Sequence, residues 1–286
     1  MGPLLIGGLY MKKNNTVTRV LNTIWVTACG IVFLMPLLWM LSSSIKQGHE
    51  VFATNFQWIP DEIQWGNYVQ VWTHEKVPFW NLYLNSLTIA VVGTVGELII
   101  ASMAGYSLSK INYKGRDLIF ILMLITMMIP AQAIIIPKFV LFDWMSLYNN
   151  LWALILPAWF NVTSIFLLKQ FYAGLPTELM EAAKIDGANH FQIWAKVMLP
   201  LTKPAMVTCA VLAFINSWNE YLSAIVFLPT SENYTVSQGI QYWMAMSDEH
   251  NLMMTAAASA IVPVVVLFLF TQKYFVESIA TTGVKG

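Results

Sequence analysis

Long apolar runs separated by short polar segments dominate the hydrophobic pattern of this chain. A helix needs about 20 apolar residues to cross the hydrocarbon core of a bilayer. Four runs of that length carry no charged residue, and two more carry a single acid, Glu97 or Glu220. The six runs lie at residues 20–41, 82–108, 118–136, 147–168, 205–228 and 252–270. The pattern therefore predicts an all-α polytopic membrane protein with six transmembrane helices.

The composition supports a membrane protein and excludes several other classes. Hydrophobic residues make up 57% of the 286 residues and charged residues only 10%, against about 25% charged in an ordinary globular domain. The 15 Lys+Arg balance the 15 Asp+Glu, so neither a disordered chain nor a basic nucleic-acid binder is expected. Cys29 and Cys209 both lie within apolar runs, and the four histidines show no metal-binding spacing. We therefore expect neither a disulfide scaffold nor a metal site.

The loops between the runs differ in positive charge, which predicts the orientation. With six spans both termini share one side of the membrane. On that side fall twelve Lys and Arg residues, namely Lys12, Lys13, Arg19, Lys110, Lys114, Arg116, Lys169, Lys184, Lys196, Lys203, Lys273 and Lys285. On the other side fall Lys46, Lys76 and Lys138. Because Lys and Arg are enriched in cytoplasmic loops, both termini are expected in the cytoplasm, as tails at residues 1–19 and 276–286.

The longest cytoplasmic loop, residues 169–203, predicts two short helices joined by a sharp turn. Thr177 is a residue type that caps helix starts, and Gly187 tolerates the left-handed conformation that ends a helix. Asn189 with Gln192 three residues later is typical of a second capped helix. Pro200 is expected to break that helix before the next span. On these signals alone, the loop is an amphipathic hairpin at the membrane surface.

The same loop resembles the EAA motif of ABC-importer permeases. That motif is Glu-Ala-Ala, three residues, Gly, nine residues, an aliphatic residue, one residue, then Leu-Pro. The chain matches it with Val197 in place of the usual Ile, and it also shows the family's common Asp-Gly-Ala. The matching residues are Glu181, Ala182, Ala183, Asp186, Gly187, Ala188, Leu199 and Pro200. The resemblance implies that this loop is a coupling helix that docks into a cleft on a cytoplasmic ATPase subunit.

Other stretches resemble the carbohydrate-uptake branch of that family, of the type of the smaller permease subunit in maltose-type systems. They are Trp218–Tyr221, Tyr106–Lys110 with Gly115-Arg116, Met128–Pro130 and Gly283–Gly286. The resemblance implies a type I ABC importer permease fold in the bacterial plasma (inner) membrane. It also implies a homologous second permease subunit, two ATPase subunits that bind ATP and Mg, and an extracytoplasmic solute-binding protein. The outer loop 229–251 is then expected to reach into the binding protein.

The chain has no phosphate-binding Gly-x-x-x-x-Gly-Lys-Ser/Thr loop, so we expect no ATPase activity and no cofactor of its own. Acids inside membrane spans are costly and are functional candidates by default. Trp218, Asn219, Glu220 and Tyr221 are candidate contacts of a solute pathway; the stronger alternative for Glu220 is a hydrogen bond to neighbouring helices. Glu97 is expected to face a partner subunit or a neighbouring helix. A stand-alone proton-coupled transporter or channel explains the two acids but not the EAA-like loop.

Overall fold

The computed structural model describes residues 16–55, 57–246 and 249–283, and within these ranges the chain is helical and has no strand. The prediction of an all-α protein is therefore confirmed for the described residues. Lys12, Lys13 and Lys285 lie outside them, as do residues 1–15 of the expected N-terminal tail and residues 284–286 of the expected C-terminal tail.

The longer helices are α1 (Thr16–Ser44), α3 (Phe79–Lys110), α11 (Lys203–Trp218) and α15 (Val262–Gly283). The shorter ones are α2 (Gly66–Trp72), α4 (Arg116–Thr126), α5 (Ala131–Trp144), α6 (Trp152–Ala158), α7 (Val162–Ala173), α8 (Glu178–Ile185), α9 (His190–Ile193), α10 (Leu199–Leu201), α12 (Leu222–Phe227), α13 (Val236–Ala245) and α14 (His250–Ala260). Three single turns complete the order: η1 (Gly48–Glu50), η2 (Trp194–Met198) and η3 (Ser231–Asn233).

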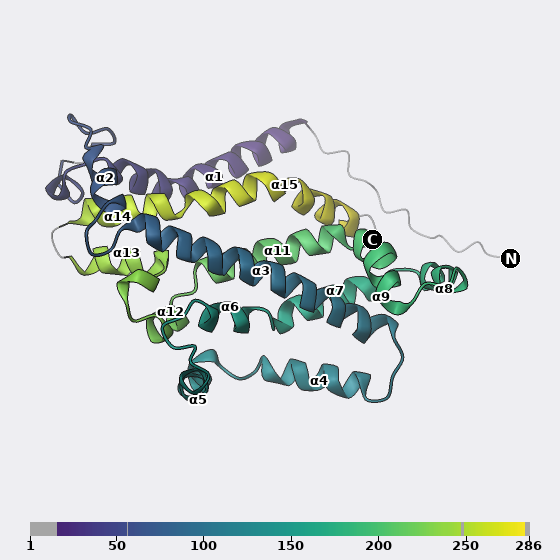
Figure 1. The fold of residues 1–286 in the computed structure, drawn as a ribbon. Coiled ribbons are helices and arrows are strands. Elements are labelled where there is room, and N and C mark those ends of the chain that lie inside the picture. The colour runs from purple at the N-terminus through teal and green to yellow at the C-terminus, as the bar shows by residue number, and fades with distance from the viewer. Residues whose placement is uncertain (1–15, 56, 247–248, 284–286) are drawn as a thin grey trace.

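Helix α3 runs through the middle of the molecule and packs along α7 and α11 (Figure 1). Helices α1 and α15 lie on one side of it, and α4 and α5 lie on the other. The approach of α3 to α7 is close, because a Cβ added at Gly105 would lie 2.9 Å from the backbone nitrogen of Lys169. Ala101, one turn earlier, is fully buried. The small-xxx-small pair Ala101 and Gly105 therefore marks a tight helix contact.

Four helical segments of the described residues are long and apolar enough to cross a membrane: Val20–Ser44, Phe79–Lys110, Trp152–Ala173 and His250–Lys273. Two bent pairs, Arg116–Thr126 with Ala131–Trp144 and His190–Leu201 with Lys203–Trp218, bring the number up to six if each pair is one span. Exposed apolar side chains such as Trp25, Phe33 and Met128 lie along these segments, as expected of surfaces that face lipid.

Several predicted spans are not straight helices. The run 118–136 is broken between α4 and α5, whose axes differ by 100°. Pro130 occupies the N-cap position of α5 with an extended backbone, because proline cannot continue the helix before it. The run 205–228 stops at Trp218 and resumes as α12 after Asn219–Tyr221. The run 252–270 is interrupted at Ile261, shortly before Pro263. At each break, backbone N–H and C=O groups lose their partners within the helix, although the surrounding sequence is apolar.

The described part of segment 229–251, which the sequence predicts as an outer loop, is largely folded onto α3 rather than extended from it. The backbone N–H of Val236 donates to Ser86 Oγ at 2.8 Å, and Asn85 Nδ2 donates to the carbonyls of Glu232 and Tyr234 at 2.8 and 3.0 Å. A Cβ at Gly239 would clash with the Leu82 side chain. Residues 244–246, at the end of α13, are exposed, as are residues 229, 230, 232 and 241; residues 247–248 lie outside the described part.

Candidate functional site

The EAA-like loop forms a hairpin of α8 and α9 that projects from one end of the molecule (Figure 1). Helix α8 begins directly after Thr177, as predicted, but the Thr177 side chain makes no capping hydrogen bond. Instead the Thr177 carbonyl accepts the backbone N–H groups of Met180 and Glu181, at 3.0 and 3.1 Å. The prediction of Thr177 as a side-chain cap is therefore wrong, because its backbone is already helical and its hydroxyl does not reach the free N–H groups.

Helix α8 ends at a glycine turn, as the sequence predicts. Gly187 has φ = +81°, a conformation that residues with a Cβ rarely adopt. Its N–H donates to the Lys184 carbonyl at 3.0 Å, and the N–H of Ala188 donates to the Ala183 carbonyl at 3.0 Å. This pair of hydrogen bonds is the Schellman motif, which satisfies the last carbonyls of a helix. The direction of the second helix relative to α8 is thus set by the backbone of Gly187.

The second helix of the hairpin is capped by Asn189, also as predicted. Asn189 Oδ1 accepts the backbone N–H of Gln192, and Gln192 Oε1 accepts the N–H of Asn189, both at 2.9 Å. The chain then passes through the π-helical turn η2 and the short α10, which contains Pro200, before bending by 83° into α11. The break falls at Thr202, two residues after the predicted position. Thr202 is fully buried there, and its Oγ1 donates to the Leu199 carbonyl at 2.8 Å.

The residues of the EAA-like motif do not form one face. Glu181, Ala182 and Asp186 are exposed, whereas Ala183, Ala188 and Leu199 pack against the buried cluster that includes Met180 and Trp194. Gly187 and Pro200 are exposed. The sequence reasoning missed Ile185, whose side chain is 87% exposed although it is apolar. Its position at the end of α8, one turn after Glu181, is the signal that it shares the exposed face.

The base of the hairpin is joined to α3 and α7 by buried polar contacts. Tyr106 Oη lies 3.3 Å from His190 Nδ1 and 3.8 Å from Met180 Sδ. Trp194 Nε1 donates to Ser102 Oγ at 2.9 Å, and that hydroxyl lies 2.7 Å from Tyr172 Oη. His190 is exposed, but the contacts among Ser102, Tyr172 and Trp194 are buried, so breaking those would leave buried polar atoms unpaired. Side-chain contacts thus join the base of the hairpin to both α3 and α7.

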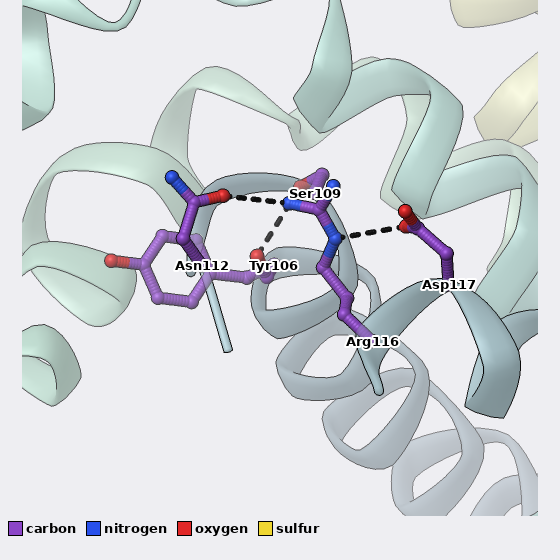
Figure 2. A network of polar contacts seen from close by, with 5 residues as sticks. All are labelled: Tyr106, Ser109, Asn112, Arg116 and Asp117. Carbon is purple, nitrogen blue, oxygen red and sulfur yellow. Dashed lines mark hydrogen bonds and ion pairs between the residues drawn. The ribbon is translucent and has the colours of Figure 1, made fainter. Parts of the chain in front are cut away.

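The turn from α3 to α4 lies at the same end of the molecule. Gly115 has φ = +86°, and Arg116 folds back so that one guanidinium nitrogen donates to Asn112 Oδ1 at 2.9 Å (Figure 2). Arg116 Nε also pairs with Asp117 Oδ1 at 3.0 Å, and Ser109 Oγ donates to the Tyr106 carbonyl at 3.2 Å. The turn is thus held by Arg116, whereas the Ser109–Tyr106 contact lies within α3.

A second candidate site is a polar hollow of about 200 Å³ beside the break between α11 and α12. Ten residues from α3, α5, α6, α11, α12 and the adjoining turns line it: Glu97, Lys138, Leu154, Pro157, Ala158, Asn161, Asn216, Ser217, Glu220 and Ser223. An adjacent hollow of about 280 Å³ shares Lys138, Glu220 and Ser223 with the first and adds Tyr221. The two hollows thus meet at one ammonium, one carboxylate and one hydroxyl.

Each charged group of the hollow is held by a partner in this chain. Glu220 Oε1 accepts the backbone N–H of Ser223 at 2.7 Å, near the start of α12. Glu97 Oε1 accepts Ser164 Oγ at 2.5 Å. The Lys138 ammonium lies 5.4 and 5.1 Å from the ring centroids of Phe142 and Phe227, distances at which cations are attracted to aromatic faces. These charges are therefore fixed in place around a shared space.

The four candidate pathway residues have different surroundings. Trp218 is 3% exposed, and its Nε1 donates to the Ala260 carbonyl at 3.1 Å, so it is a packing residue of the core. Glu220 lines both hollows, Tyr221 lines the second one, and Asn219 is exposed without lining either. Glu97 contacts a neighbouring helix of its own chain. Lys138, which the sequence places in an outer loop, lies in the hollow instead, because the bend after α4 turns α5 across the molecule.

The chain belongs to the family described as binding-protein-dependent transport system inner membrane component, which matches residues 97–281. The predicted resemblance to ABC-importer permeases is thereby confirmed. The protein is a multi-pass membrane permease component with the ABC importer permease fold.

Individual relatives carry more specific names. The arabino-oligosaccharide transport system permease protein AraQ of Halalkalibacterium halodurans is 32% identical, over 96% of this chain and 99% of the relative. The sn-glycerol-3-phosphate transport system permease protein UgpE of Pectobacterium atrosepticum is 29% identical, over 87% of this chain and 91% of the relative. Among solved structures, a chain of a bacterial ABC transporter involved in the import of the acidic polysaccharide alginate is 26% identical and superposes with a TM-score of 0.80, covering 94% of this chain and all of the other.

Proposed function

We propose that this chain is the transmembrane subunit of a binding-protein-dependent ABC importer for a sugar or oligosaccharide. It forms half of the translocation pathway and couples that pathway to ATP hydrolysis by separate subunits. Its partners are a homologous second permease subunit, two cytoplasmic ATPase subunits that hold ATP and Mg, and an extracytoplasmic solute-binding protein. Family membership supports this role, and the relatives named for arabino-oligosaccharides support the solute class.

The projecting hairpin is the observation that carries the coupling role. Ala182 is small, and Ile185 is apolar and almost fully exposed. The exposed face of α8 can therefore approach the walls of a cleft closely and bury apolar surface against them. The Schellman turn at Gly187 and the contacts to α3 and α7 make the hairpin stiff. When the ATPase subunits close, a stiff hairpin transfers their movement to the helices that surround the pathway.

The proposed topology has six membrane crossings with both termini in the cytoplasm of a bacterium and the protein in its plasma membrane. The pair Arg116–Thr126 with Ala131–Trp144 then counts as one crossing. In the second bent pair the crossing begins with Lys203–Trp218, because His190–Leu201 belongs to the hairpin and its base. The described part of α1 begins, and α15 ends, toward the hairpin end of the molecule, whereas α2 and α13 lie at the opposite end (Figure 1). This arrangement agrees with the excess of Lys and Arg on the hairpin side.

Uptake into proteoliposomes tests the proposed function. The complex is purified through a tag on this chain, reconstituted, and supplied with its binding protein and a panel of radiolabelled oligosaccharides. We expect an ATPase to co-purify and uptake to require ATP. Uptake that depends steeply on an imposed proton gradient and not on ATP would instead support the stand-alone secondary transporter.

A further inference from the structure

We propose that this chain itself contacts the solute, and that the hollow around Lys138 and Glu220 selects neutral, polyhydroxylated solutes over anionic ones. The inference rests on the proposed importer function. It adds to that function a solute site in this subunit and a preference for uncharged over anionic solutes.

The two opposite charges of the hollow face the same space without pairing with each other. Among the described residues, Lys138 and Glu220 form no ion pair within 4.0 Å, although both line the two adjoining hollows. Lys138 is attracted to the rings of Phe142 and Phe227, and Glu220 is held by the N–H of Ser223. A hydroxyl group can accept from an ammonium and donate to a carboxylate at the same time. A sugar hydroxyl therefore fits the space between them.

The rest of the lining also suits a sugar. Asn161 and Asn216 offer amide donors and acceptors, and Ser217 and Ser223 offer hydroxyls, interspersed with the apolar surfaces of Pro157 and other residues. Tyr221 adds an exposed aromatic ring in the second hollow. Polar groups within membrane segments are costly, and they commonly line a water-filled cavity or a solute pathway. Such a mixture of donors, acceptors and apolar surface matches a ring that carries several hydroxyl groups.

The charge of the lining disfavours an anion. Its ionisable side chains are two carboxylic acids, Glu97 and Glu220, and one amine, Lys138, so acidic groups outnumber basic ones. A carboxylated or phosphorylated solute would lose hydration and meet Glu220 beside the only ammonium of the lining. Relatives are named both for arabino-oligosaccharides and for glycerol-3-phosphate, and the solved neighbour belongs to an importer of the acidic polysaccharide alginate. The family therefore does not fix the charge of the solute, and the preference is argued from the lining of this chain alone.

Reaction of an engineered thiol tests both parts of the proposal. Ser223→Cys is introduced into the complex after Cys29 and Cys209 are replaced by Ser, and Thr54→Cys on the exposed outer segment serves as the reference thiol. Each thiol is treated with a neutral, glucose-bearing thiosulfonate and with an anionic sulfonatoethyl thiosulfonate. We expect the ratio of the neutral to the anionic rate to be about fivefold higher at Ser223→Cys than at Thr54→Cys, because nearby negative charge repels the anion.

Charge variants show whether the ratio comes from the hollow. Glu220→Gln should lower the ratio at Ser223→Cys toward the reference value, and Lys138→Met should raise it. Lys114→Met, which removes an exposed lysine in the α3–α4 turn, should leave it unchanged. Equal ratios at the two thiols, or a Ser223→Cys thiol that reacts with neither reagent throughout the ATP cycle, would overturn the proposal.

ATP hydrolysis measured on the same complexes separates this inference from the proposed function. Hydrolysis stimulated by the binding protein, together with equal labelling ratios, overturns the solute site and leaves the importer function standing. The expected labelling ratio in a complex without any associated ATPase supports the hollow as a neutral-solute site but contradicts the importer.

Discussion

Gly187 shows how one residue sets the geometry of a functional surface. A Cβ added there would meet no atom within 4 Å, so space does not require glycine; the positive φ of +81° does. The residue ends α8 and directs the chain into the second helix, which places the exposed face of α8 at the tip of the molecule. A substitution at this position therefore acts through the backbone alone.

We predict that Gly187→Val weakens coupling while membrane insertion stays normal. A β-branched residue in the left-handed conformation costs about 1–2 kcal/mol, so the turn should open and α8 should lose its fixed direction. Binding-protein-stimulated ATP hydrolysis and uptake are the measurements. Gly187→Asn is the matched control, because asparagine visits this conformation more readily, and it should retain most of the activity. Full activity of Gly187→Val would show that the turn is not needed.

Within helix α8, the two alanines of the motif, Ala182 and Ala183, have different surroundings. Ala182 is exposed on α8, whereas Ala183 packs against the buried cluster at the base of the hairpin and its carbonyl accepts from Ala188. The motif thus combines a docking face and a packing face on a single short helix. The same charge introduced at the two neighbouring positions should have different consequences.

Ala182→Asp should impair docking and Ala183→Asp should impair the hairpin itself. A carboxylate at Ala182 would be buried unpaired in the ATPase cleft, and we expect capture of the ATPase to fall at least about tenfold, or ~1.4 kcal/mol, with an unchanged melting temperature of the isolated chain. Ala183→Asp should lower that melting temperature as well. Capture of the ATPase at the original level by Ala182→Asp would contradict the docking assignment.

The contact between α3 and α7 leads to a prediction about stability. Gly105→Ala places a methyl group 2.9 Å from the Lys169 backbone nitrogen and 3.1 Å from the Leu168 carbonyl carbon. Backbone atoms cannot rotate away, so the helices must separate, and we expect a loss of about 1–3 kcal/mol. A thermal melt of the protein in detergent measures it. Gly30→Ala on α1 meets nothing within 4 Å and should not destabilise; equal melting temperatures for the two variants would refute the close approach.

For the whole molecule, the prediction concerns topology. The hairpin and the α3–α4 turn lie at one end, and the segment between α1 and α2 lies at the other (Figure 1). In a background without Cys29 and Cys209, Thr54→Cys should react with a membrane-impermeant maleimide in cells whose plasma membrane is intact. Lys114→Cys should react only after that membrane is permeabilised. Labelling of both thiols in intact cells would contradict the six-crossing topology.

The sequence alone predicted those features that depend on residues close together along the chain. The apolar runs indicated a helical membrane protein, and the spacing of the EAA-like motif indicated the family. Gly187 and Asn189 marked the end of one helix and the start of the next, because left-handed turns and capping boxes depend on the residues beside them. Thr177 failed as a side-chain cap for the same reason, since its own backbone conformation decides whether the hydroxyl reaches the helix start.

Only the tertiary structure decided which distant residues meet. The 100° bend after α4 carries Lys138 into a hollow with Glu97 and Glu220, which are separated from it by dozens of residues along the chain. Counting charges between apolar runs assigns Lys138 to a loop. Such a count uses only the order of residues along the chain and contains no information about the direction that the chain takes after a helix break. Trp218 and Glu220 are near neighbours in sequence, yet one is enclosed in the core and the other lines the hollow. Helix breaks and packing between distant helices, which local patterns do not encode, determine that separation.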